Sequence, residues 1–239
     1  MARLPRLYVP GEPQSILLAG GPAFLDDGDY RFYLDCLRMA AREGGVAIHA
    51  YSLTPEAVRL LATPSHESAM PTVIQALGRR YVAHFNRRHQ RAGKLWNGRY
   101  RATVLEADRY FLACSRFVET APVGAGHAPD SEIWRWSSYA HHVGMTVDPV
   151  ITDHPAYWAL GNTPFERQHA YRQLCESPLP APLVQEIASA TEKGWALGSD
   201  EYRARCARLA SRRLAPLKRG RPRPPAALDG NHKANGNPR

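Results

Sequence analysis

The first residues whose types and spacing could support a chemical function lie in a long segment without carboxylates. Residues 68–105 contain no Asp or Glu, and their central cations are Arg79, Arg80, Arg87, Arg88, Arg91, Lys94, Arg99 and Arg101. The rings interleaved with these cations are Tyr81, His84, Phe85, His89, Trp96 and Tyr100. Arginines contact phosphates and aromatic faces stack on unpaired bases, so the pattern indicates a nucleic-acid-binding surface. The alternative is a solvated basic helix with Tyr81 and Phe85 in the core, although solvated faces usually mix both signs of charge.

A second basic segment lies near the C-terminus. It begins at Arg212-Arg213 and continues at residues 218–224 as Lys-Arg-Gly-Arg-Pro-Arg-Pro, which contains Arg219 and Arg221. An Arg-Gly-Arg-Pro segment matches the core of an AT-hook, an extended peptide that lies in the narrow minor groove of AT-rich duplex DNA. A generic basic tail explains the same residues equally well. Both interpretations favour a polyanionic partner.

The composition agrees with such a partner. The 239 residues carry a formal net charge of +9, and the pI is about 9.6. This balance attracts polyanions, nucleic acid above all, although an Arg-rich protein without such a partner has the same balance. No run approaches the roughly 18 apolar residues of a membrane span, and the N-terminus lacks the apolar run of a secretory signal. The four cysteines are far apart and form no C-x-x-C pair, so we expect no zinc site, no disulfide framework and a cytoplasmic location.

The apolar pattern predicts the elements that position these side chains. In chain order they are a strand at 14–19, a helix at 26–43, strands at 46–53 and 58–62, a helix at 67–89, a strand at 99–106 and a helix at 109–119. This order fits an α+β fold, a ferredoxin-like antiparallel sheet with helices on one face.

The C-terminal third has a different character. Segments 164–176, 181–192 and 200–213 have helical patterns, and residues 214–239 have almost no apolar periodicity. We therefore expect a DNA-binding domain at 1–145, a helical extension at 146–213 and a disordered basic tail at 214–239.

Five short segments occur in an order and spacing that resemble one family. They are residues 51–64, Phe-Asn-Arg-Arg-His at 85–89, Leu-Trp-Asn-Gly-Arg-Tyr at 95–100, Ala-Pro-Val-Gly-Ala-Gly at 121–126 and Trp-Ser-Ser-Tyr at 136–139. Together they resemble the REP-associated tyrosine transposases, which are bacterial single-strand nucleases with a His-hydrophobe-His metal site. The resemblance covers about residues 5–139.

The resemblance implies a hairpin of single-stranded DNA as partner and a tyrosine nucleophile that forms a phosphotyrosine link. It also implies Mg²⁺ or Mn²⁺ held by two histidines and a third polar residue. In this chain the metal-ligand positions match Ala57, Arg59 and Ala121, and the nucleophile position matches Phe117. None of these side chains can play the family's role, and Arg59 brings a permanent cation to a cation site. We therefore expect a degenerate active site without a metal cofactor.

Other residues could replace the missing groups. Tyr110 lies two helical turns before Phe117 on the same face and is a weak substitute nucleophile, although packing is its commoner role. His49 and His66 could supply ligands, but neither has the family's spacing. Arg59 could neutralise a phosphate directly, which would support binding rather than cleavage.

Three functions follow from these observations. The first is a DNA-binding protein of the transposase family that holds single-stranded or hairpin DNA without cleaving it. The second is an active transposase or endonuclease, used in DNA transposition and recombination, that relies on displaced residues. The third is a non-functional transposase remnant. The family acts as monomers or dimers, so the sequence does not decide whether this chain forms a homodimer.

Overall fold

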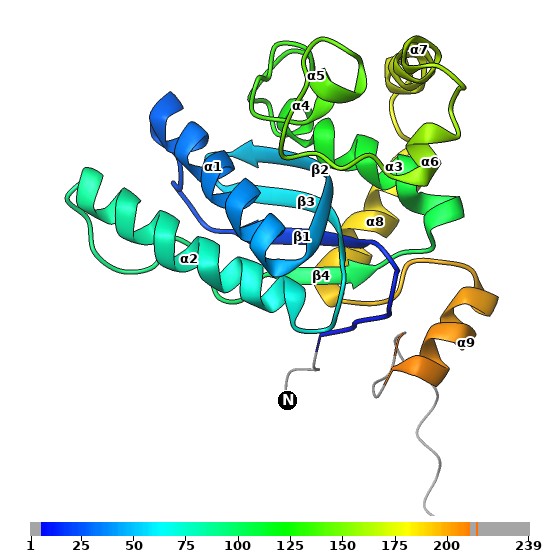
Figure 1. The fold of residues 1–239 in the computed structure, drawn as a ribbon, viewed down its shortest axis with the longest axis horizontal. Coiled ribbons are helices and arrows are strands. Elements are labelled where there is room, and N and C mark those ends of the chain that lie inside the picture. Colours follow the sequence, from blue (N-terminus) through cyan, green and yellow to red (C-terminus); the bar gives the residue numbers. More distant parts are fainter. Residues whose placement is uncertain (1–5, 211–213, 215–239) are drawn as a thin grey trace, which may run out of the picture.

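A four-stranded antiparallel sheet forms the centre of the fold (Figure 1). The computed structural model describes residues 6–210 and 214. The strands are β1 (Gln14–Ala19), β2 (Val46–Thr54), β3 (Ala57–Pro64) and β4 (Arg101–Val104). Their order in the sheet is β2-β3-β1-β4, and every pair of neighbours is antiparallel. This is the ferredoxin-like arrangement that the sequence predicts.

Two long helices cover one face of this sheet. They are α1 (Asp27–Gly44) and α2 (Ala69–Arg88), which pack against each other and against β2. Helix α1 begins at Asp26, whose side chain accepts hydrogen bonds from two backbone N–H groups of the first turn. It ends at Gly45, which has the left-handed φ of 66° that glycine adopts without strain. Both ends agree with the sequence prediction.

The other face of the sheet is also covered. Helices α3 (Ala107–Glu119) and α8 (Ala181–Lys193) pack on it. On β3, Val58 and Leu60 belong to the core cluster beneath α1 and α2, whereas Leu61 belongs to the cluster beneath α3 and α8. The sequence prediction of helices on one face therefore needs correction, because side chains on both faces of the strand are buried beneath helices.

The remaining helices lie in the second half of the chain. They are α4 (Ala121–Gly124), α5 (Tyr139–His142), α6 (Pro155–Trp158), α7 (Pro164–Glu176) and α9 (Asp200–Leu209). A capping box between Thr163 and Glu166 starts α7. After α8 the chain returns to the sheet, where the Leu197 N–H donates to the Val104 carbonyl at 2.9 Å.

The predicted C-terminal helices are present, and the last ends at Leu209. The predicted disordered tail begins at Leu214, which is described and buried in a core cluster. The rest of the tail, with the AT-hook-like segment and its Arg219 and Arg221, lies outside the described residues. Among the helices in the described part of the chain, none combines the length and apolar character of a membrane span.

Candidate functional site

Three of the four positions matched to family chemistry meet in one cleft. Arg59 of β3, Phe117 near the end of α3 and Ala121 at the start of α4 all line a cleft of about 690 Å³. Alternate residues of a strand face the same side, so Ala57 and Arg59 share the face on which α3 packs. Ala57, at the first position of β3, does not line the cleft.

Arg59 is a half-buried cation in this cleft. Its guanidinium carbon lies 5.2 Å from the centre of the Phe117 ring. Burial lowers the pKa of Arg59. Among residues 6–210 and 214, no carboxylate lies within ion-pair distance of it. A guanidinium in this position can accept an anionic ligand from solvent.

Other polar groups complete the cleft wall. The Arg116 guanidinium donates to the Ser177 carbonyl, and its buried Nε has no hydrogen-bond partner among the described residues. Asp130 and Glu176 also line the cleft, and both are exposed. The cleft therefore holds cations toward its interior and carboxylates in contact with water.

The substitute nucleophile and ligands do not fit the roles considered for them. Tyr110 is buried outside the cleft wall and donates to Glu186 Oε1 at 3.0 Å. Burial and this carboxylate raise the pKa of Tyr110, which disfavours the phenolate. His49 is bonded at both ring nitrogens, to the Thr152 carbonyl at 2.7 Å and the Thr63 hydroxyl at 2.8 Å. His66 is exposed, 3.1 Å from the Ser68 hydroxyl.

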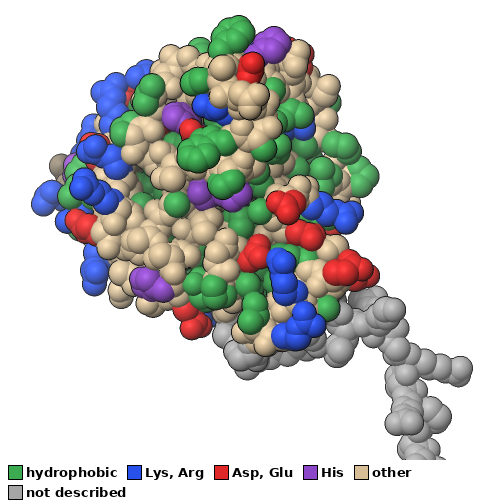
Figure 2. All heavy atoms as spheres, turned by 45° about the vertical axis from the view of Figure 1, so that its right-hand side comes forward, with side chains coloured by type: hydrophobic (Ala, Val, Ile, Leu, Met, Phe, Trp, Pro, Cys, Tyr) green, Lys and Arg blue, Asp and Glu red, His purple; other side chains and the backbone are tan. Residues whose placement is uncertain are grey.

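Most cations of the basic segment lie on the surface around α2 and the loop that follows it. Arg79, Arg80, Arg87, Arg91, Lys94 and Arg99 are exposed. Figure 2 shows Lys and Arg side chains concentrated along its left edge, the side on which α2 ends in Figure 1.

Two further cations of this segment are neutralised by distant carboxylates. Arg88 pairs with Asp26 at 2.8 Å and with the fully buried Asp29 at 3.0 Å. Arg101 pairs with Glu192 at 2.6 Å. The segment carries one sign of charge in sequence, but α1 and α8 bring the opposite sign to it in space.

The rings of the basic segment separate into two groups. Tyr81 and Phe85 are fully buried in the core, as the alternative interpretation of the sequence expects. His84 stacks on Phe32 with 3.8 Å between ring centres. Trp96 and Tyr100 are half-buried and line a second cleft.

A buried polar network, which the sequence analysis missed, lies behind the first cleft. Glu119 at the end of α3 is fully buried and accepts hydrogen bonds from the Ser138 hydroxyl, from His142 Nδ1 at 2.6 Å and from the Tyr171 hydroxyl at 2.6 Å. Burial alone would lower the pKa of His142, but the Glu119 carboxylate outweighs it, so the net pKa is raised. The only sequence signal is a carboxylate near the C-terminus of a helix, where carboxylates are unfavourable.

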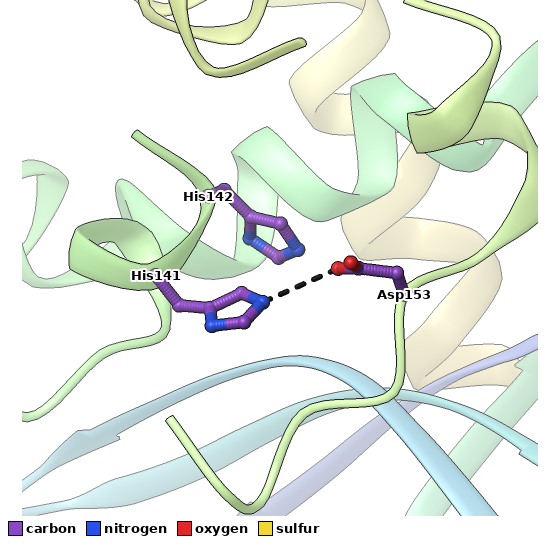
Figure 3. Close-up of side chains that lie close together, drawn as sticks. All are labelled: His141, His142 and Asp153. Carbon is purple, nitrogen blue, oxygen red and sulfur yellow. Dashed lines mark hydrogen bonds and ion pairs between the residues drawn. The ribbon is translucent and has the colours of Figure 1, made fainter. Parts of the chain in front are cut away.

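Two groups of described side chains have the composition of a metal site. In one of them, Asp26, Asp29 and His89, the histidine bonds Asp29 and Arg88 pairs with both carboxylates. His141, His142 and Asp153 offer ligand atoms within 4.8 Å of one another (Figure 3). However, His141 Nδ1 accepts the Asp148 N–H at 3.1 Å, so its Nε2 carries the proton that bonds Asp153 at 3.2 Å. A protonated nitrogen cannot bind a metal. His141 is instead hydrogen-bonded to Asp153, and His142 to Glu119.

The fold has relatives among solved structures. A REP-associated tyrosine transposase bound to a REP hairpin is similar with a TM-score of 0.53 and 12% identity, over 65% of this chain and 93% of that chain. A protein from Deinococcus radiodurans, provisionally assigned as a transposase, has a TM-score of 0.35 and 25% identity, over 47% of this chain and 91% of that chain. No protein-family model and no curated protein matches the sequence. The first likeness shows that the chain has the fold of the REP-associated tyrosine transposases, which confirms the predicted fold.

Proposed function

We propose that this chain is a DNA-binding protein of the transposase class that holds single-stranded or hairpin DNA without cleaving it. One observation carries the proposal: three positions matched to family chemistry line one cleft, where they are Arg59, Phe117 and Ala121. The cleft thus brings these matched positions together with side chains that can bind a phosphate but cannot attack it.

The chemistry of strand cleavage needs groups that these positions lack. A tyrosine attacks phosphorus through its phenolic oxygen, and the Phe117 ring has no such atom. A divalent cation needs nitrogen or oxygen ligands, which Ala57 and Ala121 do not offer, and the charge of Arg59 repels it. The residues at the matched positions therefore do not fit Mg²⁺ or Mn²⁺. Two parallel N–H groups of a guanidinium do fit a phosphate.

The exposed cations around α2 form a separate basic surface, because α2 packs on the opposite face of the sheet from the cleft. Arg79 and Arg87 lie on α2, and Lys94 lies in the following loop. No ion pair within the described residues involves these three. Free cations of this kind contact phosphates and release counterions, which gives affinity that falls with salt.

The alternative of an active enzyme has one specific candidate, Tyr110. It would need a phenolate near the scissile phosphate, yet its hydroxyl donates to Glu186 away from the cleft wall. The other alternative, a remnant without a DNA role, predicts that no specific complex forms.

One incubation separates the three functions. An end-labelled DNA hairpin with a single-stranded flank is mixed with the protein in Mn²⁺ and divided between a native and a denaturing gel. We expect a complex on the native gel and only intact free DNA on the denaturing gel. A covalent adduct that is lost in Tyr110→Phe would establish the enzyme, and absence of any complex at physiological salt would favour the remnant.

A charge reversal tests the surface. Arg87→Glu should weaken binding and flatten the salt dependence by about one phosphate contact. The control is Arg208→Glu, the same charge change at an exposed position on α9. Arg88 is unsuitable, because reversal there would also break its pairs with Asp26 and Asp29. Equal losses of DNA affinity in both variants would show that binding depends only on the net charge of the protein.

A further inference from the structure

A second cleft lies between the first half of α2, the end of β1 and the loop before β4. It has a volume of about 460 Å³, and its wall includes Trp96, Arg99, Tyr100, Thr72, Gln75 and Arg6. Leu18 and Ile74 add aliphatic surface. The cleft thus presents aromatic and aliphatic walls with polar and cationic groups among them.

Its aromatic loop is fixed before any ligand binds. Trp96 pairs with Gly20 through an isolated antiparallel bridge, and the Asn97 N–H donates to the Ala19 carbonyl at 2.7 Å. Gly20 is required here because a side chain would collide with the backbone of Leu95. The indole also packs on the core, with its ring centre 6.5 Å from that of Phe24. A wall held in this way loses little conformational entropy when a ligand stacks on it.

The charge around this cleft is of one sign. None of the described residues that line it is acidic. Arg99 is exposed, and the Arg6 guanidinium lies 3.8 Å from the centre of the Tyr100 ring. Arg79 follows Gln75 by four positions on α2, so it continues the same helical face one turn further. A ligand with a flat ring and an attached phosphate complements these features.

We propose that this cleft takes an unpaired nucleobase of the bound strand. The base lies against the Trp96 indole, Thr72 and Gln75 offer hydrogen bonds to its edge, and Arg99 contacts the adjoining phosphate. The inference rests on the proposed function, because it places one nucleotide of the same DNA ligand. Base-paired duplex cannot enter, since its bases are stacked between their neighbours.

The test compares two single strands with equal numbers of phosphates. One is a short thymidine oligonucleotide, and the other has abasic spacers in place of all its bases. Fluorescence anisotropy should show the thymidine strand binding at least about fivefold more tightly, because one stacked base contributes about 1–3 kcal/mol. Equal affinities for the two strands would overturn the base cleft and leave the proposed function intact. Binding of neither strand would overturn the base cleft, and absence of hairpin binding in the same assay would overturn the proposed function as well.

Substitutions in the cleft test whether it is the source of the preference for the thymidine strand. Thr72→Phe fills the cleft from an exposed position of α2 and should abolish the difference between the two strands. The matched control, Thr146→Phe, makes the same change at an exposed position outside the cleft and should keep the difference. Trp96→Leu, which keeps an apolar group against the core, should also abolish it. Retention of the full preference in both cleft variants would contradict the assignment.

Discussion

Replacing Arg59 by methionine should stabilise the protein and weaken its binding to DNA. The guanidinium is half-buried, contacts the Phe117 ring and has no carboxylate partner within the described residues. A fully buried unpaired ion costs several kcal/mol, and partial exposure reduces that cost. Contact between the cation and the ring offsets about 0.5–2 kcal/mol. Methionine has similar reach and keeps a sulfur contact with the ring.

These opposing contributions give a magnitude for each measurement. A net gain of about 1 kcal/mol in the free energy of unfolding raises the Tm of a chain of this size by about 2–4 °C. In the complex, a charge-assisted hydrogen bond to a phosphate contributes about 1.5–3 kcal/mol. Its loss corresponds to binding of single-stranded DNA that is roughly 10- to 150-fold weaker.

Thermal unfolding and fluorescence anisotropy on the same samples provide the test. The control is Arg38→Met, which removes a charge from an exposed pair with Asp35 on α1 and should change both quantities little. A lower Tm with unchanged affinity in Arg59→Met would refute the reasoning. It would mean that Arg59 serves packing and that the cleft does not receive a phosphate.

Two further predictions concern buried groups. Burial lowers the pKa of His49 to about 4, below its value near 6.5 in the unfolded chain. The unfolded state therefore binds more protons between these values, and the free energy of unfolding should fall by about 2 kcal/mol between pH 7 and pH 5. His49→Gln should remove this part of the pH dependence in urea unfolding, and an unchanged difference would exclude His49 as its source. Glu119→Gln should destabilise the protein by about 1.5–3 kcal/mol, because a neutral amide replaces the buried carboxylate that accepts hydrogen bonds from Ser138, His142 and Tyr171. A loss below about 0.5 kcal/mol in the same assay would contradict this role.

Much of the fold could be predicted from local pattern. The spacing of Val73, Ile74, Leu77, Tyr81 and Phe85 predicts the buried face of α2. Four of these side chains are buried, and Ile74 is partly buried against the same core. The cap at Asp26 and the stop at Gly45 follow equally from local chemistry. Both helices of the second layer were predicted, but the packing of α8 on the second face was not, because α8 reaches the sheet from a distant part of the chain.

The candidate site was less predictable, for the same reason. The family resemblance selects Arg59, Phe117 and Ala121, but only the fold shows that they share a cleft. Arg88 is neutralised by carboxylates about 60 positions earlier in the chain. Glu119 meets its partners only after α5 and α7 have packed against α3. Local periodicity contains no information on such long-range pairs.

The proposed function requires that this chain holds structured single-stranded DNA. The most direct measurement is fluorescence anisotropy of a labelled hairpin across a salt series, against an unstructured strand of equal length. We expect tighter binding of the hairpin that persists at physiological salt, with a salt dependence that reflects several phosphate contacts. Equal, weak binding of both strands that vanishes by physiological salt would contradict it, because only nonspecific attraction between basic protein and polyanion would then remain.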